Sequence, residues 1–119
     1  MTTLVGLSLA GRAVLFIGGG SSVARRLERF VAEGAQVRVI APVLHSEVAE
    51  LIARHDITCT RRAVRASDLH DVWLVHTSTG DARVDGWVAG VCEERRILCV
   101  NASDGAHGSV RIAAPRVCS

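Results

Sequence analysis

Three consecutive glycines, Gly18, Gly19 and Gly20, stand between an apolar run at residues 13–17 and a helix-like stretch. Glycine lets the chain turn sharply, and it lets a ligand approach the backbone because no Cβ is in the way. The free N–H groups and the positive dipole end of the following helix favour an anion, typically a pyrophosphate. The spacing Gly18-x-Gly20-x-x-Val23 keeps the first two glycines of the dinucleotide-binding fingerprint and replaces the third. The triplet therefore predicts a phosphate-binding turn.

The second candidate for chemistry is Asp104, in a polar segment just after an apolar run at residues 97–100. A carboxylate at that position could take or give a proton beside a bound cofactor. The alternative is a plain turn, because Asn, Ser, Asp and Gly together are ordinary loop residues. Asp81 is open to two interpretations in the same way, since an acid there could serve only as a helix cap.

The residues after the second predicted strand lack the acid that holds the adenine ribose in an ordinary NAD site. That place holds Ile40, Ala41 and Pro42. Either the ribose is held by backbone and hydroxyl groups, or the site does not bind a nucleotide. Because no arginine stands there to receive a 2′-phosphate, NAD is favoured over NADP by default.

Apolar patterns predict the elements that must position these residues. Continuous apolar runs indicate buried strands, and apolar residues spaced three and four apart indicate helices. The predicted strands are residues 13–17, 37–41, 57–60, 72–77 and 97–100, with 109–113 as a candidate sixth. The predicted helices run from Ser21 to Gly34, from an N-cap at Ser46 to Arg54, and onward from the turn at 79–81, with Val84, Trp87, Val88 and Val91 on one stripe.

Alternation of strands and helices with short links predicts a parallel sheet in a single α/β domain spanning residues 1–119. Right-handed crossovers from a central first strand give the order 3-2-1-4-5, a Rossmann-like, doubly wound sheet. Ligands bind such sheets beyond the carboxyl ends of the strands, near the switch point. That rule predicts that residues 18–22, 42–43, 77–81 and 101–104 share one site.

Composition indicates a globular protein without a membrane span. Of the 119 residues, 49% are hydrophobic and the mean hydropathy is +0.28, which argues against disorder. The longest apolar runs are too short to cross a bilayer. The first residues contain no basic segment of the kind that opens a secretory signal. We therefore expect a cytoplasmic protein that does not bind membranes.

The basic residues are all arginine, 14 in number, and the net charge is +2. The pattern suits solvated faces better than a nucleic-acid surface, because no aromatic residues are interleaved with the arginines. The functional alternative is recognition of carboxylates or phosphates, which arginine binds in bidentate fashion. The four cysteines, Cys59, Cys92, Cys99 and Cys118, have no zinc-binding spacing. They are expected to be reduced, and no metal site is predicted.

Three segments in order resemble a known family. They are LAGRAVLFIGGGSSVARRLERFVAEGAQVRVIAP, DVWLVHTSTGDARV and RRILCVNASDGAHGS. The sequence resembles the NAD-binding domain of precorrin-2 dehydrogenase, the amino-terminal module of siroheme synthase, which sometimes also has sirohydrochlorin ferrochelatase activity. The resemblance runs from about Leu4 to Pro115. It implies NAD-dependent oxidation of precorrin-2, a tetrapyrrole, to sirohydrochlorin on the route to siroheme.

The resemblance also assigns roles to residues. Gly18, Gly19 and Gly20, with Ser21 and Ser22, match the phosphate turn of the family. Pro42 and Val43 match its adenosine-side contacts, and Thr79 matches a threonine after the fourth strand. Asp104 matches the acid proposed as general base, and also for chelation where that occurs. His107 and Arg111, the nearest cationic candidates in sequence, could neutralise carboxylates of the tetrapyrrole.

The family continues beyond this pattern with a dimerisation segment and a helical region that complete the cleft of a homodimer. This sequence ends at Ser119 without them. The resemblance therefore implies the cofactor-binding part of the enzyme. The alternative is a non-catalytic NAD-binding or degenerate regulatory module, and fold alone does not decide between the two.

Overall fold

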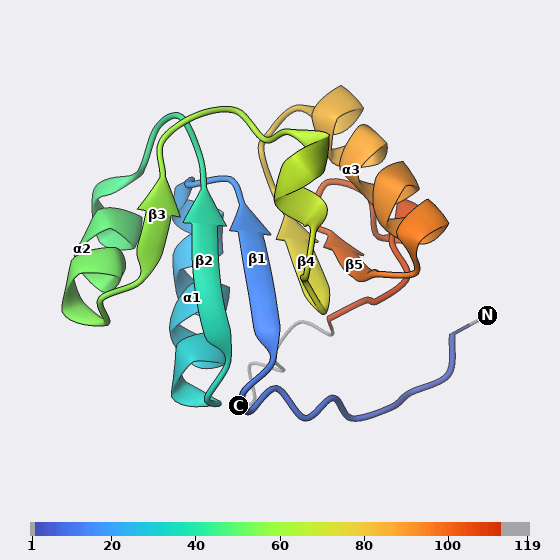
Figure 1. Cartoon of the computed structure of the whole chain (residues 1–119), viewed down its shortest axis with the longest axis horizontal. Helices are drawn as coiled ribbons and strands as arrows, with labels where there is room; N and C mark the ends of the chain where they lie inside the picture. Colours follow the sequence, from blue (N-terminus) through green and yellow to red (C-terminus); the bar gives the residue numbers. More distant parts are fainter. Residues whose placement is uncertain (1, 113–119) are drawn as a thin grey trace, which may run out of the picture.

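A computed structural model describes residues 2–112, and within them five parallel strands form one sheet in the order β3-β2-β1-β4-β5 (Figure 1). The α-helices cover both faces of this sheet. The elements are β1 (Ala13–Ile17), α1 (Ser21–Ala32), β2 (Gln36–Ile40), α2 (Ser46–Arg54), β3 (Thr58–Thr60), η1 (Ala66–Leu69), β4 (Leu74–Thr77), α3 (Ala82–Arg95), β5 (Leu98–Asn101) and η2 (Gly105–His107). The predicted fold class and strand order are confirmed.

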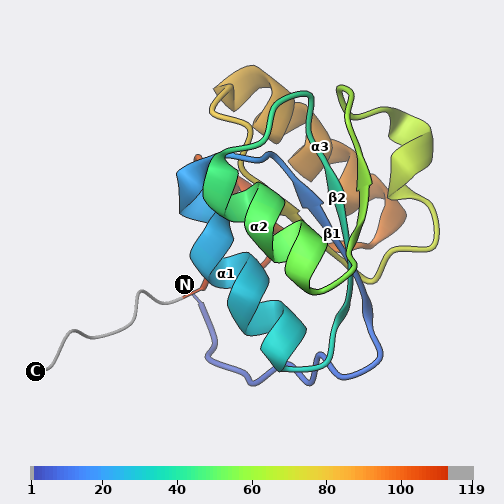
Figure 2. The same cartoon turned by 90° about the vertical axis from the view of Figure 1, so that its left-hand side faces the viewer.

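The central strand β1 is buried on both faces, which is why its sequence is apolar without alternation. Val14 and Phe16 point to the face covered by α1 and α2, which lie side by side in Figure 2. Leu15 and Ile17 point to the opposite face, which α3 covers with Val88 and its buried neighbours. Two hydrophobic clusters, one on each side, therefore hold the sheet in place.

Most predicted boundaries lie within two residues of the observed ones, and the range predicted for β1 coincides. The predicted N-cap of α2 was wrong by one position. His45 is the N-cap, and its Nδ1 accepts a hydrogen bond from the backbone N–H of Glu47. Ser46 is the first residue of the helix instead. A histidine cap is missed because Ser, Thr, Asp and Asn are the usual N-cap residues.

The candidate sixth strand at 109–113 is not a strand over residues 109–112, and Ala113 lies outside the described residues. The segment runs along the outer edge of β5 without forming a ladder. The Cys99 N–H donates to the Ser109 hydroxyl at 2.9 Å, and the Val110 N–H donates to the Cys99 carbonyl at 2.9 Å. A side-chain oxygen thus replaces the backbone carbonyl that a paired strand would supply.

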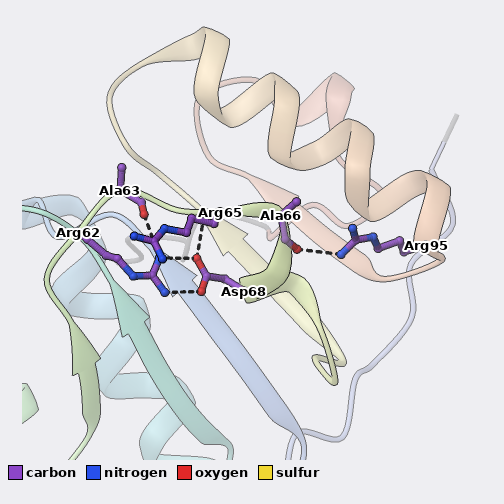
Figure 3. Close-up of polar contacts among 6 residues, drawn as sticks. All are labelled: Arg62, Ala63, Arg65, Ala66, Asp68 and Arg95. Atoms are coloured by element: carbon purple, nitrogen blue, oxygen red, sulfur yellow. Dashed lines mark hydrogen bonds and ion pairs between the residues drawn. The ribbon is translucent and has the colours of Figure 1, made fainter.

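An ion pair fixes the crossover from β3 to β4 (Figure 3). Nη1 and Nη2 of Arg62 donate to the two carboxylate oxygens of Asp68 at 2.7 and 2.6 Å. The Arg65 N–H donates to the same carboxylate, and Arg62 Nη1 also reaches the Ala63 carbonyl. These bonds close residues 62–68 into a compact segment, which we call the strap. Arg95 of α3 ties its far end by donating to the Ala66 carbonyl.

The glycine turn after β1 is packed tightly between two other loops. Gly18 has a φ of +119°, and a Cβ built on it would lie 2.0 Å from the carbonyl oxygen of Ser78. A Cβ on Gly19 would lie 2.5 Å from the carbonyl oxygen of Val43. Gly20 differs, because a Cβ there would meet nothing within 4 Å. The first two glycines are required by packing, and the third leaves space open.

This difference predicts the effect of alanine substitution. Gly18→Ala should lower the free energy of unfolding by about 3–5 kcal/mol, since backbone must move and the backbone conformation disfavours a side chain. Gly20→Ala should cost less than about 1 kcal/mol, because only the N-cap preference changes. Urea unfolding of both variants measures the difference. Equal midpoints would show that the close approach of Gly18 to Ser78 does not exist.

The strap predicts a pH-dependent contribution to stability. The Arg62 guanidinium, followed by the Arg65 N–H, holds the pKa of Asp68 below its usual range. A lowered pKa in the folded state stabilises the fold above the unfolded pKa of about 3.9, and this contribution disappears as the pH falls through the folded value. Asp68→Asn should therefore lower the urea midpoint at pH 7.

The difference in urea midpoint between Asp68→Asn and the parent should become smaller as the pH falls below about 4. The exposed pair His70–Asp71 offers a control, and Asp71→Asn should leave the midpoint nearly unchanged. If the difference in urea midpoint between Asp68→Asn and the parent stays constant from neutral to strongly acidic pH, the ionised pair is not its cause.

Candidate functional site

The carboxyl ends of the strands meet at one edge of the sheet because all five run parallel. A cleft of about 840 Å³ opens there. Its floor is formed by Ile17, Ile40 and the glycine turn, and its walls come from the β2–α2 loop, the start of the strap and the first two turns of α3. The lining residues are Ile17, Gly18, Gly19, Gly20, Ile40, Ala41, Pro42, Val43, Leu44, His45, Arg62, Ala63, Val64, Thr79, Asp81, Arg83, Val84 and Trp87.

The structure brings six of the nine predicted site residues to this cleft: Gly18, Gly19, Gly20, Pro42, Val43 and Thr79. The other three do not line it. Ser21 and Ser22 are exposed on the first turn of α1, next to the glycines. Asp104 lies on the loop after β5. The roles of all nine stay predictions, and the geometry shows only which of them are neighbours.

The amino terminus of α1 is suited to an anion. Its N-cap is Gly20, which offers no side-chain hydrogen bond, and the first turn contains no acidic residue. The first turns of α2 and α3 contain Glu47 and Asp85, respectively. The positive end of α1 is therefore not neutralised from within the helix, and the open space at Gly20 gives a phosphate access to it.

A buried carboxylate joins the loops after β4 and β5. Asp85 on α3 has no exposed surface. It accepts hydrogen bonds from the hydroxyl of Thr77 at 2.6 Å, from the hydroxyl and N–H of Thr79 at 2.9 and 3.1 Å, and from the hydroxyl of Ser103. One side chain thus fixes Thr79 in the cleft wall and the residue before Asp104.

The loop that presents Asp104 is organised by Asn101, whose side-chain oxygen accepts the N–H groups of Ser103 and Asp104 at 3.0 and 3.1 Å. The Asp104 side chain is about half exposed and pairs with Nδ1 of His107. His107, and then the N–H of Ala106, holds the pKa of Asp104 below its usual range. Asp104 is therefore an ionised, accessible carboxylate at neutral pH.

The end of β2 contributes apolar residues to the cleft, as expected, and an arginine from the strap lies across from them. Arg62 lines the cleft, but its guanidinium already serves Asp68 and the Ala63 carbonyl. The charge of Arg62 is therefore neutralised by Asp68, and its role in the described structure is to hold the strap. This role of Arg62 was not predicted, because the pair forms only when the crossover folds.

His76 is the buried histidine of the sheet, and it is not suited to proton transfer at neutral pH. Its ring stacks on Phe16 at 4.8 Å between centroids, and Arg26 Nη1 donates to its Nε2 at 3.1 Å. Burial, followed by the charge of Arg26, lowers the pKa of His76 to about 4. The imidazole is therefore neutral and held in place.

Two residues of α3, Trp87 and Asp85, were also not predicted for the site. Trp87 was placed on the buried stripe of its helix, but it is 44% exposed and lines the cleft. Asp85 was not singled out at all. The spacing could have indicated that Asp85 is buried, because it lies three residues before Val88 and so on the same, apolar face of the helix. An acid at such a position requires partners.

The described residues give no sign of a metal centre or a membrane span. Within residues 2–112, no group of three or more His, Cys, Asp or Glu residues is arranged to hold a metal ion. In the same range, no helix is both long enough and apolar enough to cross a bilayer. Cys59, Cys92 and Cys99 are free thiols, and Cys118 lies outside the described residues.

Proteins similar to this chain in sequence include a precorrin-2 dehydrogenase and a siroheme synthase. It is 33% identical over 108 residues to a precorrin-2 dehydrogenase of Priestia megaterium, an alignment that covers 91% of this chain and 53% of that protein. It is 36% identical over 86 residues to a siroheme synthase of Neisseria meningitidis serogroup C (strain 053442), covering 72% of this chain and 18% of that protein. The chain thus spans about half the length of the first and about a fifth of the second.

The solved structure of SirC, a precorrin-2 dehydrogenase, matches this fold with a TM-score of 0.83 at 33% identity. The match covers 95% of this chain and 55% of that one. A family model described as "Putative NAD(P)-binding" matches residues 5–114. The chain therefore belongs to this family of NAD(P)-binding domains.

Proposed function

We propose that this chain is the NAD-binding part of a precorrin-2 dehydrogenase, which oxidises precorrin-2 to sirohydrochlorin on the route to siroheme. The observation that carries the proposal is the glycine turn, which joins an uncapped, acid-free helix terminus to a cleft of about 840 Å³. The similarity to precorrin-2 dehydrogenase and siroheme synthase supports the same substrate. The proposal keeps the expected cytoplasmic location and the homodimer of the resembled family.

NAD is proposed in preference to NADP. A 2′-phosphate at the end of β2 would need a cationic partner. The strap arginine, Arg62, is already bonded to both oxygens of Asp68. The ribose hydroxyls would instead meet the backbone of residues 41–43, and the diphosphate would lie against the N–H groups at the start of α1. Comparing the dissociation constants of the two dinucleotides tests this choice.

The reaction removes a hydride and a proton from precorrin-2, and it yields sirohydrochlorin, NADH and H⁺. NAD⁺ supplies the hydride acceptor when bound. Asp104 is proposed to receive the proton, because its carboxylate is ionised and exposed and lies on the ligand edge of the sheet. His107 holds that carboxylate in position, and Asn101 holds the loop beneath it.

Substitution of Asp104 tests its role. In a preparation of this chain that forms NADH from NAD and precorrin-2, Asp104→Asn should reduce turnover at least about 100-fold, because general base catalysis contributes 10²–10⁴. The affinity for NAD, measured by calorimetry, should change by less than about twofold, since Asp104 does not line the cleft. Absorbance of NADH follows the reaction.

Asp71→Asn is the matched control, because Asp71 is an exposed acid that precedes the amino end of β4. Asp71 thus lies away from the carboxyl ends of the strands, where the cleft opens. The variant should leave both NAD affinity and turnover unchanged. Undiminished turnover by Asp104→Asn would remove Asp104 from the mechanism. A chain that binds NAD and forms no NADH would support the non-catalytic module, and a chain that binds no NAD would end the proposal.

A further inference from the structure

Trp87 occupies a position that packing of the fold does not explain. The buried side of α3 presents Asp85, Val88, Ala89 and Cys92 to the sheet. Trp87 lies outside this set, and 44% of its surface is exposed. Large aromatic side chains usually contribute to stability by being covered. An indole that lines a cleft and stays half uncovered is available to a ligand.

The wall around Trp87 is mainly apolar, although Arg83, one turn earlier on α3, also lines the cleft. Val84, three residues earlier on α3, lines the cleft beside it. Across the cleft lie Val43, which is 76% exposed, and Val64 of the strap. The Arg62–Asp68 ion pair holds that part of the strap in place. Exposed apolar walls held by a fixed strap suit a flat, weakly polar ring better than a phosphate or a sugar.

The topology decides which ring of a dinucleotide would lie there. The cleft is lined by the ends of β1 and β2 and by residues that follow β1, β2, β3 and β4. Among the residues up to 112 that the structure describes, none after β5 contributes to it. Asp104 follows β5, at the opposite edge of the sheet from β3. A nicotinamide ring that reacts beside Asp104 lies toward β5. The ring between the strap and α3 is therefore the adenine.

We infer that Trp87 is the platform on which the adenine ring of the bound dinucleotide stacks, opposite Val43 and Val64. This inference rests on the proposed function, because it presumes that NAD binds with its diphosphate at the glycine turn. It adds a specific side chain that contacts the base. Stacking of a base on an aromatic side chain is strong and tolerates small displacements.

The chain offers an internal optical test, because Trp73 is its other tryptophan. Trp73 precedes β4 at the amino end of the sheet, and Arg12 lies 4.8 Å above its ring. In Trp73→Phe the fluorescence reports Trp87 alone, and NAD and AMP should quench it while nicotinamide mononucleotide should not. In Trp87→Phe the remaining Trp73 signal should not respond to any of the three.

Affinities measured by calorimetry give the second test. Trp87→Leu should weaken binding of NAD and AMP by about 10- to 100-fold, the range expected for loss of one stacked base. Trp87→Phe keeps an aromatic face and should bind within about threefold of the parent. The matched control Trp73→Leu should leave the affinities unchanged. Because Trp87 is half exposed, the urea midpoint of Trp87→Leu should stay close to that of the parent.

The outcomes separate this inference from the proposed function. Unchanged NAD affinity in a folded Trp87→Leu variant, or quenching of Trp87 by nicotinamide mononucleotide instead of AMP, overturns the inference and leaves NAD binding intact. Weaker binding of precorrin-2 with unchanged binding of NAD would assign the apolar wall to the tetrapyrrole, which also overturns it. A parent chain that binds no NAD overturns both.

Discussion

Asp85 lies on the inner side of α3 with no exposed surface, so its carboxylate has lost its hydration and depends on protein donors. An unpaired charge at this depth would cost several kcal/mol. Hydroxyl groups of Thr77, Thr79 and Ser103 and a backbone N–H compensate it. These donors come from β4 and from the loops after β4 and β5. The requirement to satisfy one carboxylate therefore fixes the relative position of both loops.

The same constraint reaches the glycine turn through the backbone. Asp85 fixes Thr79, and Ser78 immediately precedes it, with its N–H bonded to the Ile17 carbonyl at 2.8 Å. The carbonyl of Ser78 then occupies the space that a side chain on Gly18 would need. Gly18 is thus required by its packing against the loop after β4. A glycine-rich fingerprint read only as a phosphate motif misses this packing role.

The fold could be predicted because its signals are local. The apolar run of β1, the helical stripe that includes Leu27 and Phe30, and the handedness of crossovers are sufficient to give the strand order. The site was predictable only where it follows the strand ends, as at Pro42 and Thr79. The Arg62–Asp68 pair lies in an irregular crossover, where no helix or strand periodicity indicates which side chains meet. For that reason the pair and the strap it holds were not foreseen.

Trp87 and Asp85 show how the single helix α3 both lines the cleft and packs against the sheet. Trp87 lines the cleft and Asp85 is buried against the sheet. The two residues lie on different faces of the helix because they are two positions apart. The predicted stripe included Trp87 because its spacing from Val84, Val88 and Val91 is helical. The actual core positions are Val88, Ala89 and Cys92, which are smaller. Asp85 is buried among them because hydroxyl groups donate hydrogen bonds to its carboxylate. Hydrophobicity alone therefore predicted neither the burial of Asp85 nor the exposure of Trp87.

In the proposed function, ligand binding and proton transfer belong to different loops, and Asp85 is the side chain that contacts both. Thr79 lines the cleft, and Ser103 immediately precedes Asp104. Their hydroxyl groups meet on the same carboxylate. A shift of the cleft wall would therefore change the donors that Asp85 must satisfy and move the Asp104 loop with it. If Asp104 is the base of the proposed reaction, rigid coupling of this kind would hold it at a fixed distance from the bound ring, as catalysis by orientation requires.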